Sequence, residues 1–466
     1  MISSPSIASP PSGKLAHSDL FDQSVLSELA QRLVEAAKRA GADAADAVAV
    51  RGVSQGVEVR DGRVEESERS EGDDVGLRVL VGRRQAVVST NDVGGDGAMR
   101  LAERAVAMAK VAPDDKYVGL ADPALLARDF PDLDLLDPGM PSVAELEQRA
   151  QAAEAAGLAV KGVTKSGGAS ASAGIGGMVL VTSAGFHGAY LRSSQSISMT
   201  AISGEGTGME RDYDYTSAPH AADLLPPEQV GKVAGERTVA RANPRKVETC
   251  NVPVVYDPRV SGSLVGHLVG AVNGASIARK TSFLKDRLGQ QLFASNVRIV
   301  DDPLRRRGLR SQSFDAEGVK VKKLAIIDEG VLTSWLLDSA TARELGLVTT
   351  GHAHRGVSSS PSPGPYNLHL EAGEATPAEL IADIKQGFYV TDLIGSGVNG
   401  VTGDYSRGAS GFWIENGTIS YPVSEVTIAG HLLEMFKSMV PASDLEFRYG
   451  VNAPTVRIEG LTLGGR

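Results

Sequence analysis

Two places in the chain carry histidines that bear on metal chemistry. His352 and His354 form an H-x-H pair in TTGHAHRG (residues 349–356), and His267 lies in SLVGHLVGAVNG (263–274). On a strand, His352 and His354 would point both rings to one face, where two imidazoles can bind a metal ion. The pair is flanked by glycine and has no acidic residue close to it in sequence. We therefore keep two interpretations, a weak metal site and a turn or channel-lining segment.

A glycine-rich stretch, VNGVTGDYSRGASGFWIENG (398–417), holds five glycines in twenty residues. Glycine permits positive φ and a close approach of the backbone, so such a segment can offer N–H and C=O groups to an extended peptide. The alternative is a tight hairpin whose turns are stabilised by Asp and Asn side chains. The candidate substrate-binding residues are Asn399, Thr402, Gly403, Asp404, Tyr405, Ser406 and Arg407.

Composition and motifs argue against several other classes of protein. The chain has 47 Lys+Arg against 57 Asp+Glu and no dense basic run that could neutralise phosphates, so we expect no nucleic-acid partner. Cys250 is the only cysteine, which excludes an intrachain disulfide and any zinc site with two cysteines. Neither a nucleophile elbow nor a P-loop is present. Without a signal peptide or a long apolar run, we expect a cytoplasmic protein that does not enter a membrane.

The elements that would hold these residues begin with helices and strands in alternation. Helical spacing of apolar residues predicts helices at 24–40, 95–112 and 142–159, the last with Ser142 and Glu145 as a capping box. Short Val-rich or Ser/Thr-rich runs with glycine turns predict small sheets at 45–90 and 163–214. Residues 111–142 keep no single period and are predicted to be a surface connection.

The second half of the chain is predicted to be richer in strands. A helix ends near Asn243, because the residue before a proline is pushed out of the helical region. Beyond it we expect a strand at 252–257, a helix at 259–278, many short strands and a helix at 426–440. The prediction is an α+β fold: a disordered tail (1–18), an N-terminal domain of small mixed or antiparallel sheets with covering helices (19–245), and a C-terminal β-rich domain with a few helices (246–466).

Five segments of the chain together resemble one known family. They are SGEGTGMERDYDY (203–215), GHLVGAVNGASIARKTSFLKDRLGQQLF (266–293), TTGHAHRG (349–356), VNGVTGDYSRGASGFWIENGTISYPVSEVTIAGHLLEMF (398–436) and APTVRIEGLTLGG (453–465). On these segments the chain resembles the TldD/PmbA family, also described as modulators of DNA gyrase, and within it the PmbA (TldE) branch.

The resemblance implies where zinc chemistry would be found. The catalytic TldD branch carries His-Glu-x-x-x-His on the helix after the first strand of the second domain, where two imidazoles hold zinc and the glutamate is the general base. Here neither ligand nor the carboxylate is present, and a lone His267 falls short of the roughly three protein ligands that such a zinc needs. We expect no zinc of this kind. The degenerate zinc-helix positions read Gly266, His267, Leu268, Val269, Gly270 and Ala271.

The function that the resemblance implies is that of a non-catalytic subunit. It would pair with a TldD-like metallopeptidase, complete a chamber and bind unfolded peptides, with zinc in the partner and no cofactor in this chain. An isolated chain could instead form a homodimer. Two alternatives stay open: a regulatory protein that acts on DNA gyrase, and a self-sufficient metallohydrolase that uses His352, His354 and a distant carboxylate.

Overall fold

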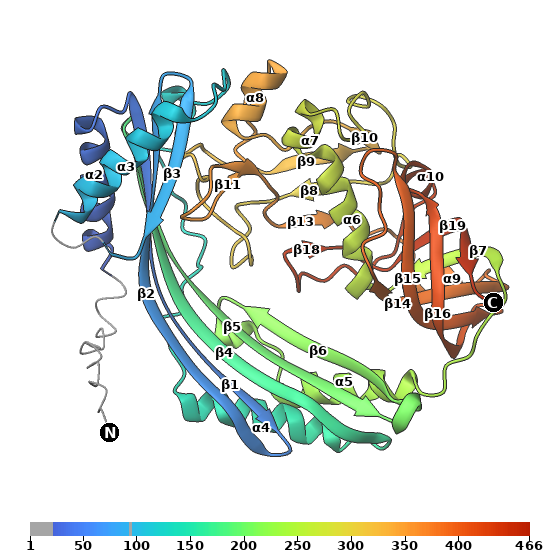
Figure 1. The fold of residues 1–466 in the computed structure, drawn as a ribbon. Helices are drawn as coiled ribbons and strands as arrows, with labels where there is room; N and C mark the ends of the chain where they lie inside the picture. Colours follow the sequence, from blue (N-terminus) through green and yellow to red (C-terminus); the bar gives the residue numbers. More distant parts are fainter. Residues whose placement is uncertain (1–21, 93–95) are drawn as a thin grey trace, which may run out of the picture.

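The computed structural model describes residues 22–92 and 96–466, and it confirms the predicted α+β fold. Two parts form an arch (Figure 1): a long curved sheet with helices on its outer side, and a β-rich part that contains the C-terminus. The tail predicted at residues 1–18 lies outside the described residues. The domain boundary at residues 245 and 246 stays a prediction; it falls between helix α5 (Pro227–Ala240) and strand β7 (Cys250–Tyr256).

The first part is built on one antiparallel sheet of six strands, in the order β3-β2-β1-β4-β5-β6. The prediction of short strands in small sheets is wrong in extent, because β1, β2 and β4 are 17, 19 and 20 residues long. Gly52 and Gly72 pair with each other inside β1 and β2, so glycine marks no turn there. The strands are β1 (Ala44–Arg60), β2 (Arg63–Val81), β3 (Arg84–Thr90), β4 (Val163–Thr182), β5 (His187–Ser203) and β6 (Glu210–Ala218).

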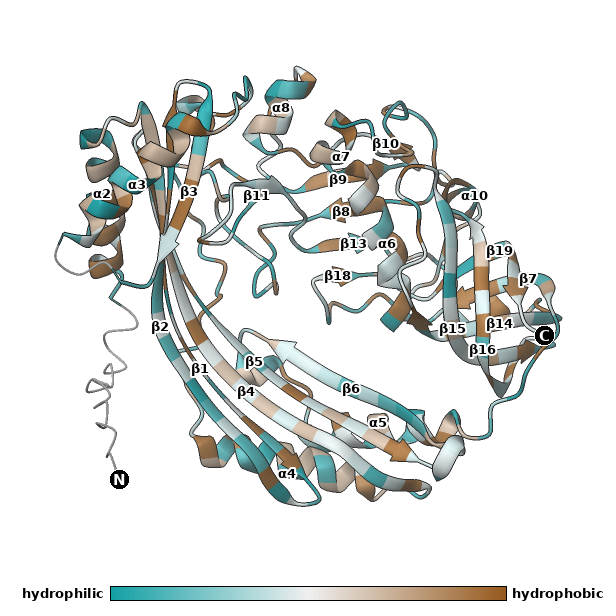
Figure 2. Ribbon diagram, in the orientation of Figure 1, coloured by the Kyte–Doolittle hydropathy of each residue, from teal (hydrophilic) through white to brown (hydrophobic). Residues whose placement is uncertain are grey.

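Four helices cover one face of this sheet, in two pairs. Helices α2 (Ser24–Arg39) and α3 (Gly97–Val111) pack on residues such as Ala47 and Leu77 near one end of the strands. Helices α4 (Val143–Leu158) and α5 pack on Val57 and Ile197 near the other end, and α4 begins with the predicted Ser142–Glu145 capping box. Apolar and polar residues alternate along the strands (Figure 2), so the opposite, concave face is more polar, and none of the described helices of this part packs on it.

The described residues of the second part form two large sheets beside helix α6 and a two-stranded sheet, β11-β12. One sheet has the order β16-β15-β14-β7-β19-β17, and an additional β16–β19 pairing closes it on itself; a five-stranded sheet has the order β10-β9-β8-β13-β18. Helix α6 (Pro258–Val272) lies beside both and faces the space under the arch (Figure 1). The remaining strands are β8 (Ile299–Asp301), β9 (Leu324–Asp328), β10 (Val331–Leu332), β11 (Ala353–His354), β12 (Ser362–Pro363), β13 (Leu368–Leu370), β14 (Gln386–Ile394), β15 (Asp404–Glu415), β16 (Thr418–His431), β17 (Val440–Pro441), β18 (Val451–Asn452) and β19 (Val456–Gly464).

Two predicted helices of this part are shorter in the structure. The helix expected at 259–278 is interrupted at Asn273, whose side chain caps the separate helix α7 (Gly274–Ala278). The helix expected at 426–440 is confined to α10 (Leu432–Lys437), because Val426 and Ile428 pair with β15 inside strand β16. Short apolar runs fit both helical and strand spacing, and here the sheet partners decide. Helices α8 (Ser339–Leu345) and α9 (Pro377–Ile381) complete the part.

The predicted surface connection at 111–142 runs between the two parts. Its Ala127 N–H donates to the carbonyl of Gly318 at 2.8 Å, and its Leu133 carbonyl accepts from the N–H of Arg307 at 2.9 Å. It also contains a short 3₁₀ helix, Pro123–Leu125. The segment is therefore hydrogen-bonded to the C-terminal part and holds the arch together at that side.

Candidate functional site

The degenerate zinc-helix positions lie on α6, next to a pair of buried tyrosines. The His267 ring meets the Tyr405 ring edge-on, with the centroids 5.8 Å apart, and the Tyr405 hydroxyl lies 3.5 Å from that of Tyr256. Among the described residues, Nε2 of His267 has no hydrogen-bond partner. A Cβ at Gly266 or Gly270 would meet no described atom within 4 Å, so this side of α6 is open.

This set of groups does not fit zinc. Gly266 and Ala271, where the family's motif places imidazoles, carry no donor atom, and in residues 22–92 and 96–466 no three His, Cys, Asp or Glu side chains gather in a way that could hold a metal ion. Burial, followed by the positive charge of Arg407, lowers the pKa of His267 to about 4. The ring is thus a neutral imidazole in an environment that repels a cation.

The lowered pKa of His267 predicts how stability depends on pH. The pKa of His267 in the folded chain lies below its ordinary value of 6.5. The free energy of unfolding is therefore at its full value above pH 6.5 and decreases as the pH falls toward 4, because the unfolded chain then binds a proton that the folded chain does not. We expect His267→Leu to remove about 2 kcal/mol of this acid sensitivity, a value reduced from the full shift because the ring is only partly buried. Urea unfolding of the natural chain and of His267→Leu, above pH 6.5 and near pH 4, measures this difference. If both proteins lose the same unfolding free energy between the two pH values, the prediction is wrong.

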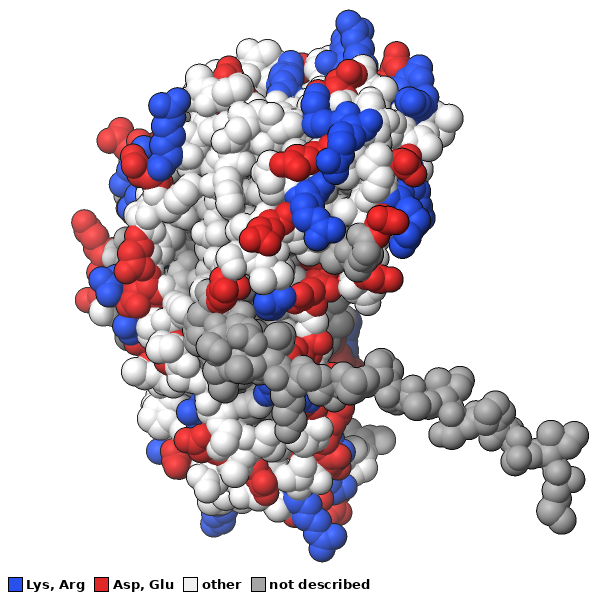
Figure 3. All heavy atoms as spheres, turned by 90° about the vertical axis from the view of Figure 1, so that its left-hand side faces the viewer, with Lys and Arg blue, Asp and Glu red and all other residues white. Residues whose placement is uncertain are grey.

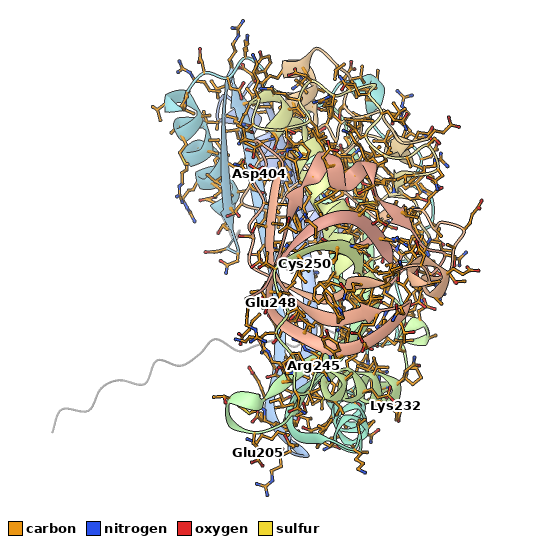
Figure 4. The ribbon with its side chains drawn as sticks, turned by 90° about the vertical axis from the view of Figure 1, so that its right-hand side faces the viewer. Glu205, Lys232, Arg245, Glu248, Cys250 and Asp404 are labelled. Atoms are coloured by element: carbon orange, nitrogen blue, oxygen red, sulfur yellow. The ribbon has the colours of Figure 1, made fainter. Side chains whose placement is uncertain are left out.

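The glycine-rich stretch forms a tight turn that leads into β15. Oδ1 of Asn399 accepts from the N–H of Val401 at 2.9 Å, the Thr402 hydroxyl donates to Asp404, and Gly403 has a φ of 90°. Asp404 begins β15 on the side of the molecule seen in Figure 4. Asn399, Thr402 and Asp404 therefore stabilise the turn itself, which is the alternative that the sequence left open.

The rest of this stretch points to different surroundings. Tyr405 is buried against His267, Ser406 is exposed, and Nε of Arg407 donates to the carbonyl of Ile394 at 3.4 Å. Gly403 fits closely, because a Cβ there would lie 3.0 Å from the ring of His431. A role of these residues in substrate binding stays a prediction.

His352 and His354 lie in the interior of the C-terminal part. His352 is 0% exposed; its Nδ1 donates to the carbonyl of Thr350 at 2.9 Å, and Nε2 lies 3.4 Å from Oδ2 of Asp301. The His354 ring packs on Tyr366 with the centroids 4.6 Å apart, and burial, then His352, lowers its pKa to about 4. A substrate has no access to the buried His352, so this geometry does not favour a metallohydrolase site.

A cavity that the sequence did not predict lies between the two parts, with a volume of about 880 Å³. β6, β14 and the start of α6 meet there. Its ion pairs join the parts: Nη1 of Arg259 on α6 donates to Oδ1 of Asp212 on β6 at 2.7 Å, and Arg241 approaches Asp212 and Asp392 at 3.5 Å each. The lining residues are Thr200, Ile202, Met209, Glu210, Arg211, Asp212, Tyr213, Arg241, Arg259, Val260, Thr391, Asp392, Leu393, Ile394 and Gly395.

The sequence carries only a faint signal of this cavity. β6 reads ERDYDY, in which buried Asp212 alternates with partly exposed Tyr213, so one face of the strand is acidic and the other aromatic. An acidic strand face predicts cationic partners, but the partner Arg259 lies 47 residues away on another element. Only the folded chain brings the two together.

Lys, Arg, Asp and Glu are mixed over the face shown in Figure 3, with no continuous basic surface there. Of the described helices, none combines the length and the apolar character that crossing a bilayer requires.

Three segments of the chain match the domains of one class of enzyme, the PmbA/TldA metallopeptidases. Residues 45–109 match domain 1, residues 136–242 the central domain, and residues 249–465 the C-terminal domain. The chain belongs to the PmbA/TldD family, and its relatives place it in the PmbA branch.

Relatives and solved structures agree along almost the whole chain. Metalloprotease PmbA of Escherichia coli O157:H7 is 38% identical over 88% of this chain and 90% of its own. The PmbA homologue of Haemophilus influenzae is 37% identical over 93% and 94%. A Bacteroides thetaiotaomicron protein, described as a candidate modulator of DNA gyrase, superposes with a TM-score of 0.87 at 26% identity, covering 95% of this chain and 99% of that one.

Proposed function

We propose that this chain is a non-catalytic subunit of a peptidase assembly whose zinc is held by a TldD-like partner. The observation that carries the proposal is the residue set on α6: the positions of the family's zinc ligands are Gly266 and the buried Ala271, neither of which has a donor atom, and the lone His267 lies against Tyr405. Members of this family are named metalloproteases, so a chain with the fold but without the ligand set is best explained as a partner of one that has them.

The chain would contribute walls and binding surface for an unfolded peptide. Support comes from the concave sheet face, which no helix among residues 22–92 and 96–466 covers, and from the cavity between β6 and α6, which lies under the arch. An enclosed space admits an extended chain and excludes a folded protein. The main-chain groups of an edge strand such as β6 can also pair with an extended peptide with little dependence on its sequence. Specificity would then come from access.

The test is the zinc content and peptidase activity of the isolated chain, of a TldD-like partner, and of their mixture, with an unfolded peptide as substrate. We expect no stoichiometric zinc and no cleavage by the chain alone, and cleavage by the mixture above that of the partner alone. Stoichiometric zinc together with activity in the isolated chain would overturn the proposal. So would co-purification with DNA gyrase at high salt in place of a peptidase partner, which would favour the regulatory alternative.

A matched variant sharpens this test. Ala271→His together with Gly266→His and His267→Glu restores the family's His-Glu-x-x-x-His order on α6. The variant supplies two of the roughly three protein ligands that a peptidase zinc needs, so we expect it to bind zinc weakly and the natural chain to bind none there. Equal zinc content of the two proteins would contradict this expectation.

A further inference from the structure

Three exposed apolar side chains from two segments of the chain line the cavity between the two parts. Met209 is 48% exposed, Tyr213 50% and Ile394 62%, and all three line the same space. Met209 lies just before β6, Tyr213 within β6, and Ile394 at the end of β14. Large apolar side chains that gather around a hollow from different elements mark a binding surface, whereas single exposed ones are ordinary.

The charged groups of this cavity compensate one another. Arg211, Arg241 and Arg259 carry three positive charges, and Glu210, Asp212 and Asp392 carry three negative ones. Arg259 is held by Asp212 at 2.7 Å, and Arg241 lies 3.5 to 3.6 Å from Asp212, Asp392 and Glu210. The cavity has a formal charge of zero and most of its ions are paired. Burial of a charged ligand there would therefore cost desolvation free energy without a compensating ion pair.

The shape of the cavity suits a peptide that inserts side chains into it better than the flat surface of a folded partner. Its volume of about 880 Å³ lies within the range of roughly 300–1,000 Å³ that is typical of ligand pockets. Arg259 and Tyr213 also line a neighbouring pocket of about 330 Å³ that extends along α6 to Ser263. The lining of this second pocket includes Gly262 and Ser263, so it lies about one turn before Gly266 on α6, where a peptide would lie in the proposed assembly.

We infer that the cavity formed by Met209, Tyr213 and Ile394 binds uncharged, apolar side chains of an extended peptide. The inference rests on the proposed function and goes beyond it by assigning a side-chain class to one position of the peptide path. Apolar recognition suits unfolded chains, because the side chains that a folded protein buries are the ones that an unfolded chain exposes.

Binding to the isolated chain, measured by fluorescence anisotropy, tests the inference without any partner or metal. The probes are a labelled unstructured peptide with Leu and Phe residues and the same peptide with Ser at those positions. We expect the apolar peptide to bind at least 10-fold more tightly, and Ile394→Ser and Met209→Ser each to weaken its binding about 3- to 10-fold, since each deletes part of the contact area. The Ser peptide should bind all variants equally weakly.

Val348→Ser is the matched control, because Val348 is 67% exposed and does not line this cavity. Equal affinity of the two peptides, or an equal loss with Val348→Ser, would overturn the inference. So would Ile394→Ser and Met209→Ser variants that keep peptide affinity but lose association with a peptidase partner, since the surface would then be an interface. The zinc and mixing experiment is independent of these results, so failure of the proposed function can be told apart from failure of this inference.

Discussion

Replacing Asp46 with alanine is expected to lower the free energy of unfolding by about 3–5 kcal/mol, because it leaves buried cations without their counterion. Asp46 on β1 accepts a hydrogen bond from Nε of Arg78 on β2 at 2.8 Å. It also forms an ion pair with Arg355 of the C-terminal part. Burial alone would raise the pKa of Asp46, but Arg355 and Arg78 outweigh it and lower that pKa. The carboxylate therefore joins the two parts of the arch at this end.

The packing around Asp46 leaves little room for rearrangement. Gly76 lies in the same strand as Arg78, and a Cβ there would collide with the backbone of Val357, two residues after Arg355. The freed guanidinium groups cannot turn to solvent without separating the two parts. Among the described residues, Glu317 and Asp338 are the other carboxylates whose charges act on Arg78.

An exposed pair of the same kind supplies the control. Arg84 and Asp114 lie 2.6 Å apart with both side chains largely in solvent, so Asp114→Ala should cost less than about 1 kcal/mol. Urea unfolding of the three proteins at neutral pH measures both values. A loss at Asp46 no larger than that at Asp114 would show that the two parts are held together elsewhere.

Local signals in the sequence predicted those elements whose stability is local. The capping box of Ser142 and Glu145 and the apolar spacing of Leu26, Leu29 and Leu33 placed α4 and α2 to within a residue or two. Such contacts join residues three or four positions apart, and they do not depend on the rest of the fold.

Long-range pairing decided what local signals could not. Val426 and Ile428 directly precede the helical spacing of Leu432, Leu433 and Phe436, yet they form strand because both pair with β15, and Ile428 pairs with β19 as well. Gly52 and Gly72 resemble turn signals, but they continue two long strands that pair with each other. The motif around Gly266, His267 and Ala271 could be recognised in the sequence, because ligand chemistry depends on residue type. The cavity could not be predicted, because its walls come from residues far apart in the chain.

Replacing Asp212 with asparagine is expected to change both stability and the class of peptide that the cavity prefers. Asp212 is buried and holds Arg259 at 2.7 Å, so loss of its charge should cost about 2–3 kcal/mol of unfolding free energy. Asparagine keeps the shape and can still accept the 2.8 Å bond from the N–H of Tyr213. The fold should therefore survive, with a cavity whose formal charge has changed from zero to a net positive charge.

Asp392→Asn is the control variant, because it changes the charge of the same cavity without removing a buried carboxylate: the side chain of Asp392 is 44% exposed. Both variants should gain affinity for a peptide with Glu residues, and the gain should shrink as salt is added, because the new attraction is electrostatic. Only Asp212→Asn should also lose stability. Peptide anisotropy at two salt concentrations and urea unfolding measure the two effects. If neither variant binds the acidic peptide more tightly, the charges of this cavity do not face a peptide, and the site of apolar recognition must be sought elsewhere along α6.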